Sequence, residues 1–332
     1  MVRVAHSIFD TADLLDTIKD HFETPPLDTC LFFRSFINDT YRLAAAGRLY
    51  YLRIYQAGWR TRTEVEAELD AIERTFELGG AVARPVPLRA GGFVFDLPAP
   101  EALRPAVLFH EAPGIDFTYD GANGAANAHR YGRAVAQLHA VTSRLAPPAG
   151  RRPLDLQTML EGPRQIVAAR LFDDDSDYFA RLCDRLQQRI GDDPNLTLGF
   201  CHGDLNSSNI HFDRDRPTVI DFDCCGWGWL SSDIAAFARG VTLGRYPGPA
   251  ASELIGAFLR GYTAEKSIGT ADRDALPACL LMQRIWVSSL HLDGHHRWGN
   301  IHYGEQYAAR LVRWLRAWDN VLDRRPDWLD VE

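Results

Sequence analysis

Hydrophobic positions in the first 110 residues follow two periods. Apolar residues recur at helical spacing over residues 10–22 and 61–78, and Gly79 and Gly80 end the second of these predicted helices. Short runs rich in β-branched and aromatic residues predict strands at 30–37, 39–44, 49–55, 86–89, 93–95 and 106–110. We expect this region to form a small antiparallel sheet with one long helix.

Beyond Pro113 and Gly114 the period changes to 3.6. Helices are predicted at 129–145, 155–171, 177–190, 252–262, 273–292 and 303–322, and an island of strand-like runs interrupts them at 198–223. The pattern predicts an α+β protein with a sheet-containing N-lobe at 1–107, a connecting segment at 108–114 and a mainly helical C-lobe at 115–332.

Composition and charge narrow the class of protein. The 332 residues are 46% hydrophobic, and 36 Lys and Arg stand against 44 Asp and Glu, a net charge of −8. This charge argues against nucleic acid or an anionic membrane as the main partner. The chain has no run of 18 apolar residues and no secretion signal at its start, so we expect a cytoplasmic protein. Its six cysteines include no C-x-x-C pair, and reduced packing residues are expected.

The candidate chemistry lies in residues 200–223, which read FCHGDLNSSNIHFDRDRPTVIDFD. Their first part fits H-x-D-L-x-x-x-N, the catalytic-loop pattern of protein kinases, and the final DFD matches the first two letters of D-F-G. In this pattern Asp204 faces the acceptor hydroxyl as the catalytic residue. Asn209 and Asp221 supply the oxygen ligands that Mg²⁺ prefers. We expect His202 to hold the loop rather than to act as an acid or base.

These motifs support a family resemblance. HGDLNSSN followed by DFD is similar to the aminoglycoside phosphotransferase and choline kinase group, which has a kinase-like bilobal fold. The stretch that follows DFD, ending in Asp233-Ile234-Ala235, most resembles the stress-response kinases of the SrkA/RdoA kind, and type II homoserine kinases are also close. The resemblance implies that Asp233 braces the catalytic loop.

A kinase of this type places a cation near the phosphates of ATP, and here that cation is expected to be an arginine. The chain has two lysines: Lys19 precedes every predicted strand, and Lys266 lies in the helical region. Arg53 stands on the third strand, where a kinase has its lysine, with a solvent-facing arginine as the alternative. Among the glutamates of the following helix, Glu68 lies nearest the apolar stripe and is the expected partner of Arg53.

The rest of the nucleotide site is expected in two backbone segments. The turn between the first two strands contains Asn38 and no glycine, and its amide groups are expected near the phosphates. The connecting segment, with Phe109, His110 and Glu111, should present the N–H and C=O groups that an adenine edge needs.

The sequence thus predicts an ATP- and Mg²⁺-dependent phosphotransferase that acts on a hydroxyl of a small molecule, such as an amino alcohol or an aminoglycoside. One alternative is a protein serine/threonine kinase of the stress-response type. Another is a nucleotide-binding pseudokinase, because arginine replaces the usual lysine and DFD replaces D-F-G. The sequence identifies neither the acceptor, nor ATP over GTP, nor the oligomeric state.

Overall fold

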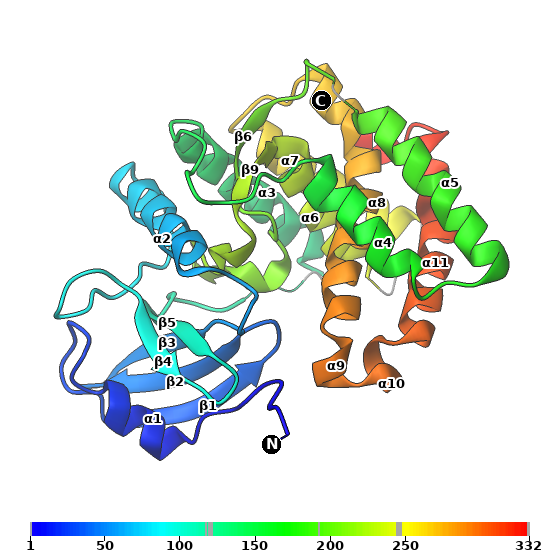
Figure 1. The fold of residues 1–332 in the computed structure, drawn as a ribbon. Coiled ribbons are helices and arrows are strands. Elements are labelled where there is room, and N and C mark those ends of the chain that lie inside the picture. The colour runs from blue at the N-terminus through cyan, green and yellow to red at the C-terminus, as the bar shows by residue number, and fades with distance from the viewer. Residues whose placement is uncertain (1, 117, 119–121, 192, 244–247, 331–332) are drawn as a thin grey trace. The chain divides into compact units, whose positions relative to one another are not determined.

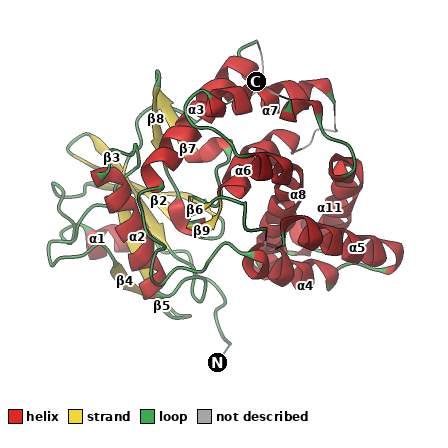
Figure 2. Ribbon diagram, turned by 90° about the horizontal axis from the view of Figure 1, so that it is seen from above, coloured by secondary structure: helices red, strands yellow, loops and turns green. Residues whose placement is uncertain are grey.

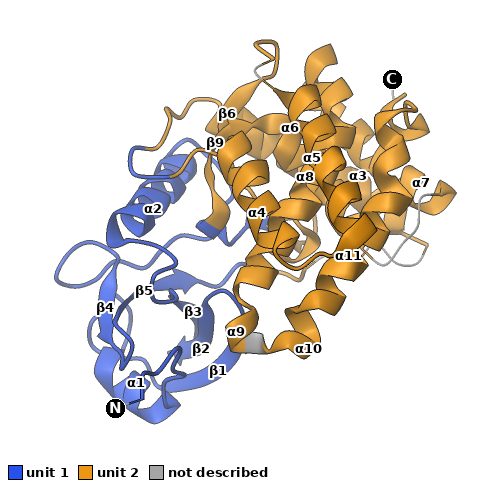
Figure 3. Cartoon of the chain, turned by 45° about the vertical axis from the view of Figure 1, so that its right-hand side comes forward, with its two compact units in different colours: residues 1–113, 149–151, 218–223 blue, residues 114–148, 152–217, 224–332 orange. Residues whose placement is uncertain are grey.

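The computed structural model of the chain describes residues 2–116, 118, 122–191, 193–243 and 248–330. The chain forms two compact units (Figure 3). Unit 1 contains residues 1–113, 149–151 and 218–223, and unit 2 contains residues 114–148, 152–217 and 224–332. Asp221 and Asp223 therefore belong to the same unit as the N-terminal sheet, whereas Asp204 and Asn209 belong to unit 2.

Unit 1 is built on a five-stranded antiparallel sheet in the order β1-β2-β3-β5-β4. The strands are β1 (Thr29–Ser35), β2 (Asp39–Ala45), β3 (Arg48–Ile54), β4 (Phe95–Pro98) and β5 (Leu103–His110). Tyr41, Leu52 and Leu108 are aligned across β2, β3 and β5, so they share one face of the sheet. Arg53 and Val107 are aligned on the opposite face.

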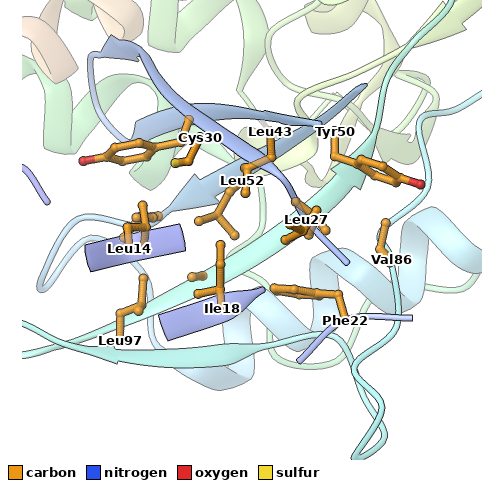
Figure 4. Packing of buried hydrophobic residues seen from close by; sticks show 14 of the residues in the cluster. Leu14, Ile18, Phe22, Leu27, Cys30, Leu43, Tyr50, Leu52, Val86 and Leu97 are labelled. Carbon is orange, nitrogen blue, oxygen red and sulfur yellow. The ribbon is translucent and has the colours of Figure 1, made fainter. Parts of the chain in front are cut away.

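One helix covers each face of this sheet (Figure 1). Helix α1 (Thr11–Ile18) buries Leu14 and Ile18 in a core with the strand residues, and Figure 4 shows these side chains beside Leu43, Leu52 and Leu97. Helix α2 (Arg62–Glu77) meets the face that carries Arg53. It begins at a capping box, in which the Thr61 side chain and Glu64 satisfy each other's backbone N–H groups.

The prediction of a hairpin with strands at 86–89 and 93–95 is wrong. Residues 81–94 contain only isolated bridges, and β4 begins at Phe95. Pro85 and Pro87 lack the N–H groups that a ladder requires, which explains why no regular strand forms. The turn at Gly91 and Gly92 is present, because the Leu88 N–H donates to the Gly92 carbonyl at 2.8 Å.

Unit 2 is mainly helical (Figure 2). Its helices are α3 (Gly124–Thr142), α4 (Gly162–Ala168), α5 (Asp173–Ile190), α6 (Leu230–Thr242), α7 (Pro249–Thr263), α8 (Thr270–Asp293), α9 (His295–Trp298), α10 (Asn300–Tyr303) and α11 (Glu305–Trp318). Helix α8 packs against α4, α5, α6 and α11, and α3 packs along α7. None of the helices described is long and apolar enough to span a lipid bilayer.

Short strands carry the predicted island at 198–223 and the residues that follow it. They are β6 (Leu198–Cys201), β7 (Ile210–Asp213), β8 (Arg216–Val219) and β9 (Gly226–Trp229). Strands β6 and β9 are antiparallel, with Cys201 opposite Gly226. Val219, at the end of β8, bridges Val82 within unit 1, which holds the following residues 220–223 in that unit.

Candidate active site

The loop after β6 presents the first part of the motif in unit 2. His202 is buried, and its Nδ1 accepts a hydrogen bond from the backbone N–H of Asp204 at 3.2 Å, so it holds the loop. Gly203 has a φ of +88°, and a Cβ there would lie 2.3 Å from the Cys224 carbonyl oxygen. The motif therefore requires glycine at this position for both conformation and space.

Asp233 fixes this loop from the first turn of α6. Its two carboxylate oxygens accept the backbone N–H groups of His202 at 2.6 Å and Gly203 at 2.7 Å. The ring of His139 lies 3.3 Å from the same carboxylate, which is fully buried. A buried carboxylate that accepts several donors is a rigid anchor, which agrees with the bracing role that the family resemblance implies.

Asp204 and Asn209 lie side by side at the end of this loop. The Asn209 amide nitrogen donates to the Asp204 carbonyl at 2.8 Å, and the Asn206 amide donates to Asp204 Oδ2 at 3.0 Å. The Asp204 side chain keeps 29% of its surface exposed, so it remains accessible. Arg239, near the end of α6, donates to Asp204 Oδ1. The sequence does not single out Arg239, because it lies 35 residues from Asp204 in an apolar helix.

Asn209 has one polar atom available for a ligand. Its amide nitrogen is engaged with Asp204, and among the described residues no donor bonds to its Oδ1. A carboxamide oxygen is a hard ligand of the kind that Mg²⁺ accepts.

In unit 1 the guanidinium of Arg53 joins two carboxylates. Its Nη1 donates to Glu68 Oε1 at 2.9 Å, and its Nη2 lies 2.8 Å from Asp221 Oδ1. The predicted pairing of Arg53 with Glu68 is therefore present in the structure. Glu64 caps α2, and Glu66 forms an exposed ion pair with Arg62, so neither competes for Arg53.

Burial shapes the electrostatics of this group. Desolvation raises the pKa of the Glu68 carboxyl, and the charge of Arg53 opposes that rise. The Tyr55 hydroxyl donates to Glu68 Oε2 at 3.0 Å, and burial next to that carboxylate raises the pKa of Tyr55 as well. The Arg53 pKa is raised above its ordinary value, because the nearby acidic groups outweigh its desolvation. Arg53 therefore remains a cation.

Asp221 has an unusual backbone. Its φ of +65° is uncommon for any residue other than glycine, and such positions concentrate at functional sites. Arg53 binds Asp221 Oδ1, while the one cation near Asp221 Oδ2 in the described part of the chain is Arg34, at 3.7 Å. The second oxygen thus remains open to another ligand.

Asp223, the last residue of DFD, anchors unit 1. Its carboxylate accepts the Asn38 amide at 2.8 Å, the Trp59 indole N–H at 2.7 Å and Arg60 Nε at 2.9 Å. Arg60 and Arg151 also donate to its carbonyl oxygen. The neighbouring arginines outweigh its burial and lower the pKa of Asp223 to about 2. Because its oxygens are engaged, Asp223 is a structural residue rather than a metal ligand.

The remaining predicted nucleotide residues also lie in unit 1. The Asn38 side chain is occupied: besides its bond to Asp223, its Oδ1 accepts the Gln56 N–H at 3.2 Å. Phe109 and His110 end β5, and the Phe109 ring lies 5.0 Å from the Arg53 guanidinium carbon. The His110 N–H donates to the Arg84 carbonyl, and Glu111 follows directly after the strand.

Comparison with known protein families identifies the family of this chain. Residues 29–277 match the model of a family described as the phosphotransferase enzyme family. The chain belongs to this family. The predicted family and a phosphotransferase activity are thereby confirmed.

Relatives of this phosphotransferase include an uncharacterized protein of Deinococcus radiodurans. The two are 29% identical over 320 residues, which span 95% of this chain and 91% of the relative.

Solved structures with the same fold include an amicoumacin kinase in complex with AMP-PNP and Ca²⁺. Its TM-score is 0.73 at 21% identity, with 98% of this chain and 96% of that chain covered. A microcompartment-associated aminopropanol kinase has a TM-score of 0.73 at 20% identity, with 97% and 99% covered. These likenesses confirm the predicted kinase-like α+β fold.

Proposed function

We propose that this phosphotransferase transfers the γ-phosphoryl group of ATP, together with Mg²⁺, to a hydroxyl group of a small molecule. The observation that carries the proposal is the Arg53 fork, which binds Glu68 and Asp221 at the same time. Residues 53, 68 and 221 come from a strand, a helix and the DFD segment. A kinase needs a cation held by the helix glutamate next to its metal-binding aspartate.

Unit 2 supplies the groups that act on the acceptor. The Asp204 carboxylate accepts or orients the proton of the acceptor hydroxyl, which makes the oxygen a better nucleophile. Arg239 and Asn206 hold the two oxygens of that carboxylate, and Asp233 fixes the backbone before it. This set of contacts limits the rotation of the Asp204 side chain and keeps it ready for an acceptor.

Unit 1 supplies the groups that hold the nucleotide. Arg53 is a permanent cation with a planar fork of donors, which suits it to bidentate phosphate contacts. The segment of Phe109, His110 and Glu111 meets the adenine edge through backbone groups other than the His110 N–H, which donates to the Arg84 carbonyl. The side chain of Asn38 fixes the turn between β1 and β2, so that backbone amides of this turn can approach the phosphates.

The donor set fits a magnesium ion. Asn209 Oδ1 and Asp221 Oδ2 are hard oxygen atoms without a close protein donor among the described residues. Mg²⁺ takes one or two protein ligands in such sites and completes its shell with water and phosphate oxygens. When bound, ATP provides the phosphoryl group, and the metal neutralises charge on its phosphates.

Small-molecule kinases among the structural neighbours favour a small alcohol over a protein as acceptor. The competing protein-kinase hypothesis is tested by comparing phosphate incorporation from labelled ATP into a cell lysate with ATP turnover on a panel of alcohols. A small-molecule kinase turns over one or more alcohols and labels no lysate protein above the Asp204→Ala background.

Two variants test the mechanism. Asp204→Ala should lower turnover by about 10²–10⁴-fold, because proton transfer to a positioned base contributes that much. It should still be stabilised by ATP and Mg²⁺ in a thermal-shift assay, whereas Arg53→Gln should lose most of that stabilisation. Asp213→Asn, at an exposed position, is the control. Wild-type turnover by Asp204→Ala contradicts the mechanism, and an unmodified protein that binds ATP without turning it over supports a pseudokinase.

A further inference from the structure

Cationic and hydroxyl side chains of α6 and α8 form a group in unit 2, and Arg239 of this group contacts Asp204. Gln283 on α8 donates to the Gly203 carbonyl at 3.3 Å, so this helix contacts the catalytic loop directly. Arg284 is the next residue of α8. On α6, Arg239 pairs with Asp204, and its side chain is only 4% exposed.

Arg239 and Arg284 are linked through α11. The Thr242 hydroxyl, one turn after Arg239, donates to the Arg239 carbonyl, and the Thr242 carbonyl accepts the Trp314 indole N–H at 3.1 Å. The Arg284 guanidinium carbon lies 5.7 Å from the centre of the Trp314 ring. A chain of contacts through Thr242 and Trp314 therefore connects Arg239 with Arg284.

Several donors in this group have no acceptor. Nε of Arg239, Nε of Arg284 and Oγ of Ser288 are buried, and no hydrogen-bond partner is present for them among the described residues. Arg284, Ser288 and His291 are spaced i, i+4, i+7 on α8, so they share one side of the helix. Unpaired buried donors cost free energy, so their persistence indicates a ligand that satisfies them.

The charge of the group is unbalanced. Asp204 neutralises Arg239, but within the described part of the chain no carboxylate pairs with Arg284. His291 does not add a charge at neutral pH, because burial and the two arginines lower its pKa to about 4. Burial and Arg239 also lower the Arg284 pKa. The carboxamide oxygen of Gln283 is a free acceptor, but it carries no charge.

We propose that the alcohol acceptor carries an oxyanion, a carboxylate or a phosphate, which Arg284 and the Ser288 hydroxyl bind while the acceptor hydroxyl reaches Asp204. This inference rests on the proposed phosphotransferase function and narrows its substrate class. It differs from the cationic amino alcohols and aminoglycosides that the sequence suggests. A guanidinium that lies against an indole ring and whose Nε–H has no acceptor among the described residues is suited to such an anion.

The test compares matched acceptors that differ in charge. ATP turnover is measured with glycerol 3-phosphate against glycerol, glycerate against glyceramide, and 3-hydroxybutyrate against 3-hydroxybutyramide, with 3-amino-1-propanol as the cationic probe. The anionic member of at least one pair should have the higher kcat/KM. The phosphate and carboxylate pairs then tell which oxyanion is preferred. Equal or better use of the neutral and cationic probes overturns the proposal.

Variants of Arg284 test whether this group of side chains causes the preference for an anionic acceptor. Arg284→Gln should raise KM for the anionic acceptor by about 10- to 100-fold, as expected for loss of a hydrogen bond to a charged group, with a smaller effect on kcat. Arg284→Lys should restore part of the loss. Arg313→Gln removes an exposed arginine of α11 next to Trp314 and should leave KM unchanged. An unchanged KM in Arg284→Gln overturns the proposal.

A binding measurement covers the case in which none of these alcohols is turned over. With AMP-PNP and Mg²⁺ present, glycerol 3-phosphate, glycerate or 3-hydroxybutyrate should raise the melting temperature of the wild type and not that of Arg284→Gln. Absence of any shift in the wild type overturns the proposal. Failure of the proposed function looks different, because ATP and Mg²⁺ would then neither stabilise the protein nor be consumed with any acceptor.

Discussion

Asp223 makes more interactions than the D-F-G pattern predicts for this position. A kinase D-F-G segment ends in glycine, whereas here a buried carboxylate takes that place and accepts donors from Asn38, Trp59 and Arg60. These donors come from the β1–β2 turn and from the loop before α2. The side chain therefore ties the DFD segment to both of these parts of unit 1.

Replacing Asp223 tests this role. Asp223→Asn removes the charge and points an amide donor at groups that are themselves donors, so Arg60 loses its buried partner. We expect a loss of about 3–5 kcal/mol in the free energy of unfolding, as for other broken buried ion pairs. Asp28→Asn, at an exposed position of the same unit, should change it by less than about 0.5 kcal/mol. Equal urea midpoints for the two variants would show that the contacts of Asp223 do not stabilise the protein.

His291 predicts a pH dependence of stability. Burial, reinforced by Arg284 and Arg239, lowers its pKa from 6.5 to about 4, and the ring also meets Tyr303 and Tyr307. The unfolded chain takes up a proton near pH 6.5, and the folded chain does so only near pH 4. Stability from this group is therefore complete above pH 6.5 and falls between pH 6.5 and 4, by about 3 kcal/mol.

His291→Gln should remove that part of the pH dependence, because glutamine does not titrate. Urea unfolding of the variant and the wild type at pH 7, 5.5 and 4.5 measures the difference. His296→Gln, at an exposed histidine, is the matched control and should follow the wild type. Parallel pH curves for wild type and His291→Gln would show that the ring protonates freely in the folded protein.

The residues of the candidate site that belong to a local sequence pattern were predictable. The loop spacing gives Asp204 and Asn209, and the helical stripe selects Glu68 over its neighbours. Arg239 and Arg284 were not predictable, because each lies in a helix whose pattern reports only burial. Their relation to Asp204 depends on how α6 and α8 cross the loop, and no local spacing encodes that packing.

At the scale of elements, two glycines allow a close helix contact in unit 2. Helices α3 and α7 run against each other (Figure 2). A Cβ on Gly132 of α3 would lie 1.9 Å from the Phe258 carbonyl oxygen, and a Cβ on Gly261 of α7 would lie 1.9 Å from the His129 carbonyl oxygen. Each helix thus uses a glycine to admit the backbone of the other.

Gly132→Ala should therefore destabilise the protein although alanine favours an isolated helix. The helix preference contributes about 1 kcal/mol in favour of alanine, and separating the backbones should cost more, for a net loss of about 1–3 kcal/mol. Urea unfolding measures the loss. Gly248→Ala should be nearly neutral, because a Cβ at this extended N-cap of α7 meets no atom of the described residues within 4 Å, apart from its chain neighbours. A stabilised Gly132→Ala protein would contradict the close contact.

The elements of unit 2 were easier to predict than those of unit 1. A helical stripe repeats over several turns, so α5, α7 and α8 begin and end within a few residues of their predicted bounds. The predicted helix at 155–171 is instead a π-helical turn, Gln157–Glu161, followed by α4. Strand pairing is non-local, and prolines at 85 and 87 outweigh the β-like composition around them.

At the scale of the whole molecule, the chain returns twice to its first unit. Residues 149–151 and 218–223 leave the helical part of the sequence and join the N-terminal sheet region. Arg151 uses this return to donate to the Asp223 and Glu64 carbonyls, all within unit 1. A linear reading of the sequence places one boundary near residue 110 and does not foresee these returns, because only tertiary contacts define them.

The cysteines give a prediction that covers both units. None of the six forms a disulfide; Cys224, directly after DFD, is partly exposed and the other five are buried. Burial raises the pKa of Cys30 to about 11 and those of Cys183 and Cys279 to about 12, so at pH 8 these thiols are almost entirely protonated and unreactive.

A thiol-reactive dye should therefore modify about one group rapidly in the native protein and six in denaturant. Cys224→Ser should abolish the rapid phase, and Cys30→Ser should leave it intact. A second rapid thiol in the Cys224→Ser protein would show that one of the buried sites opens on the timescale of the reaction.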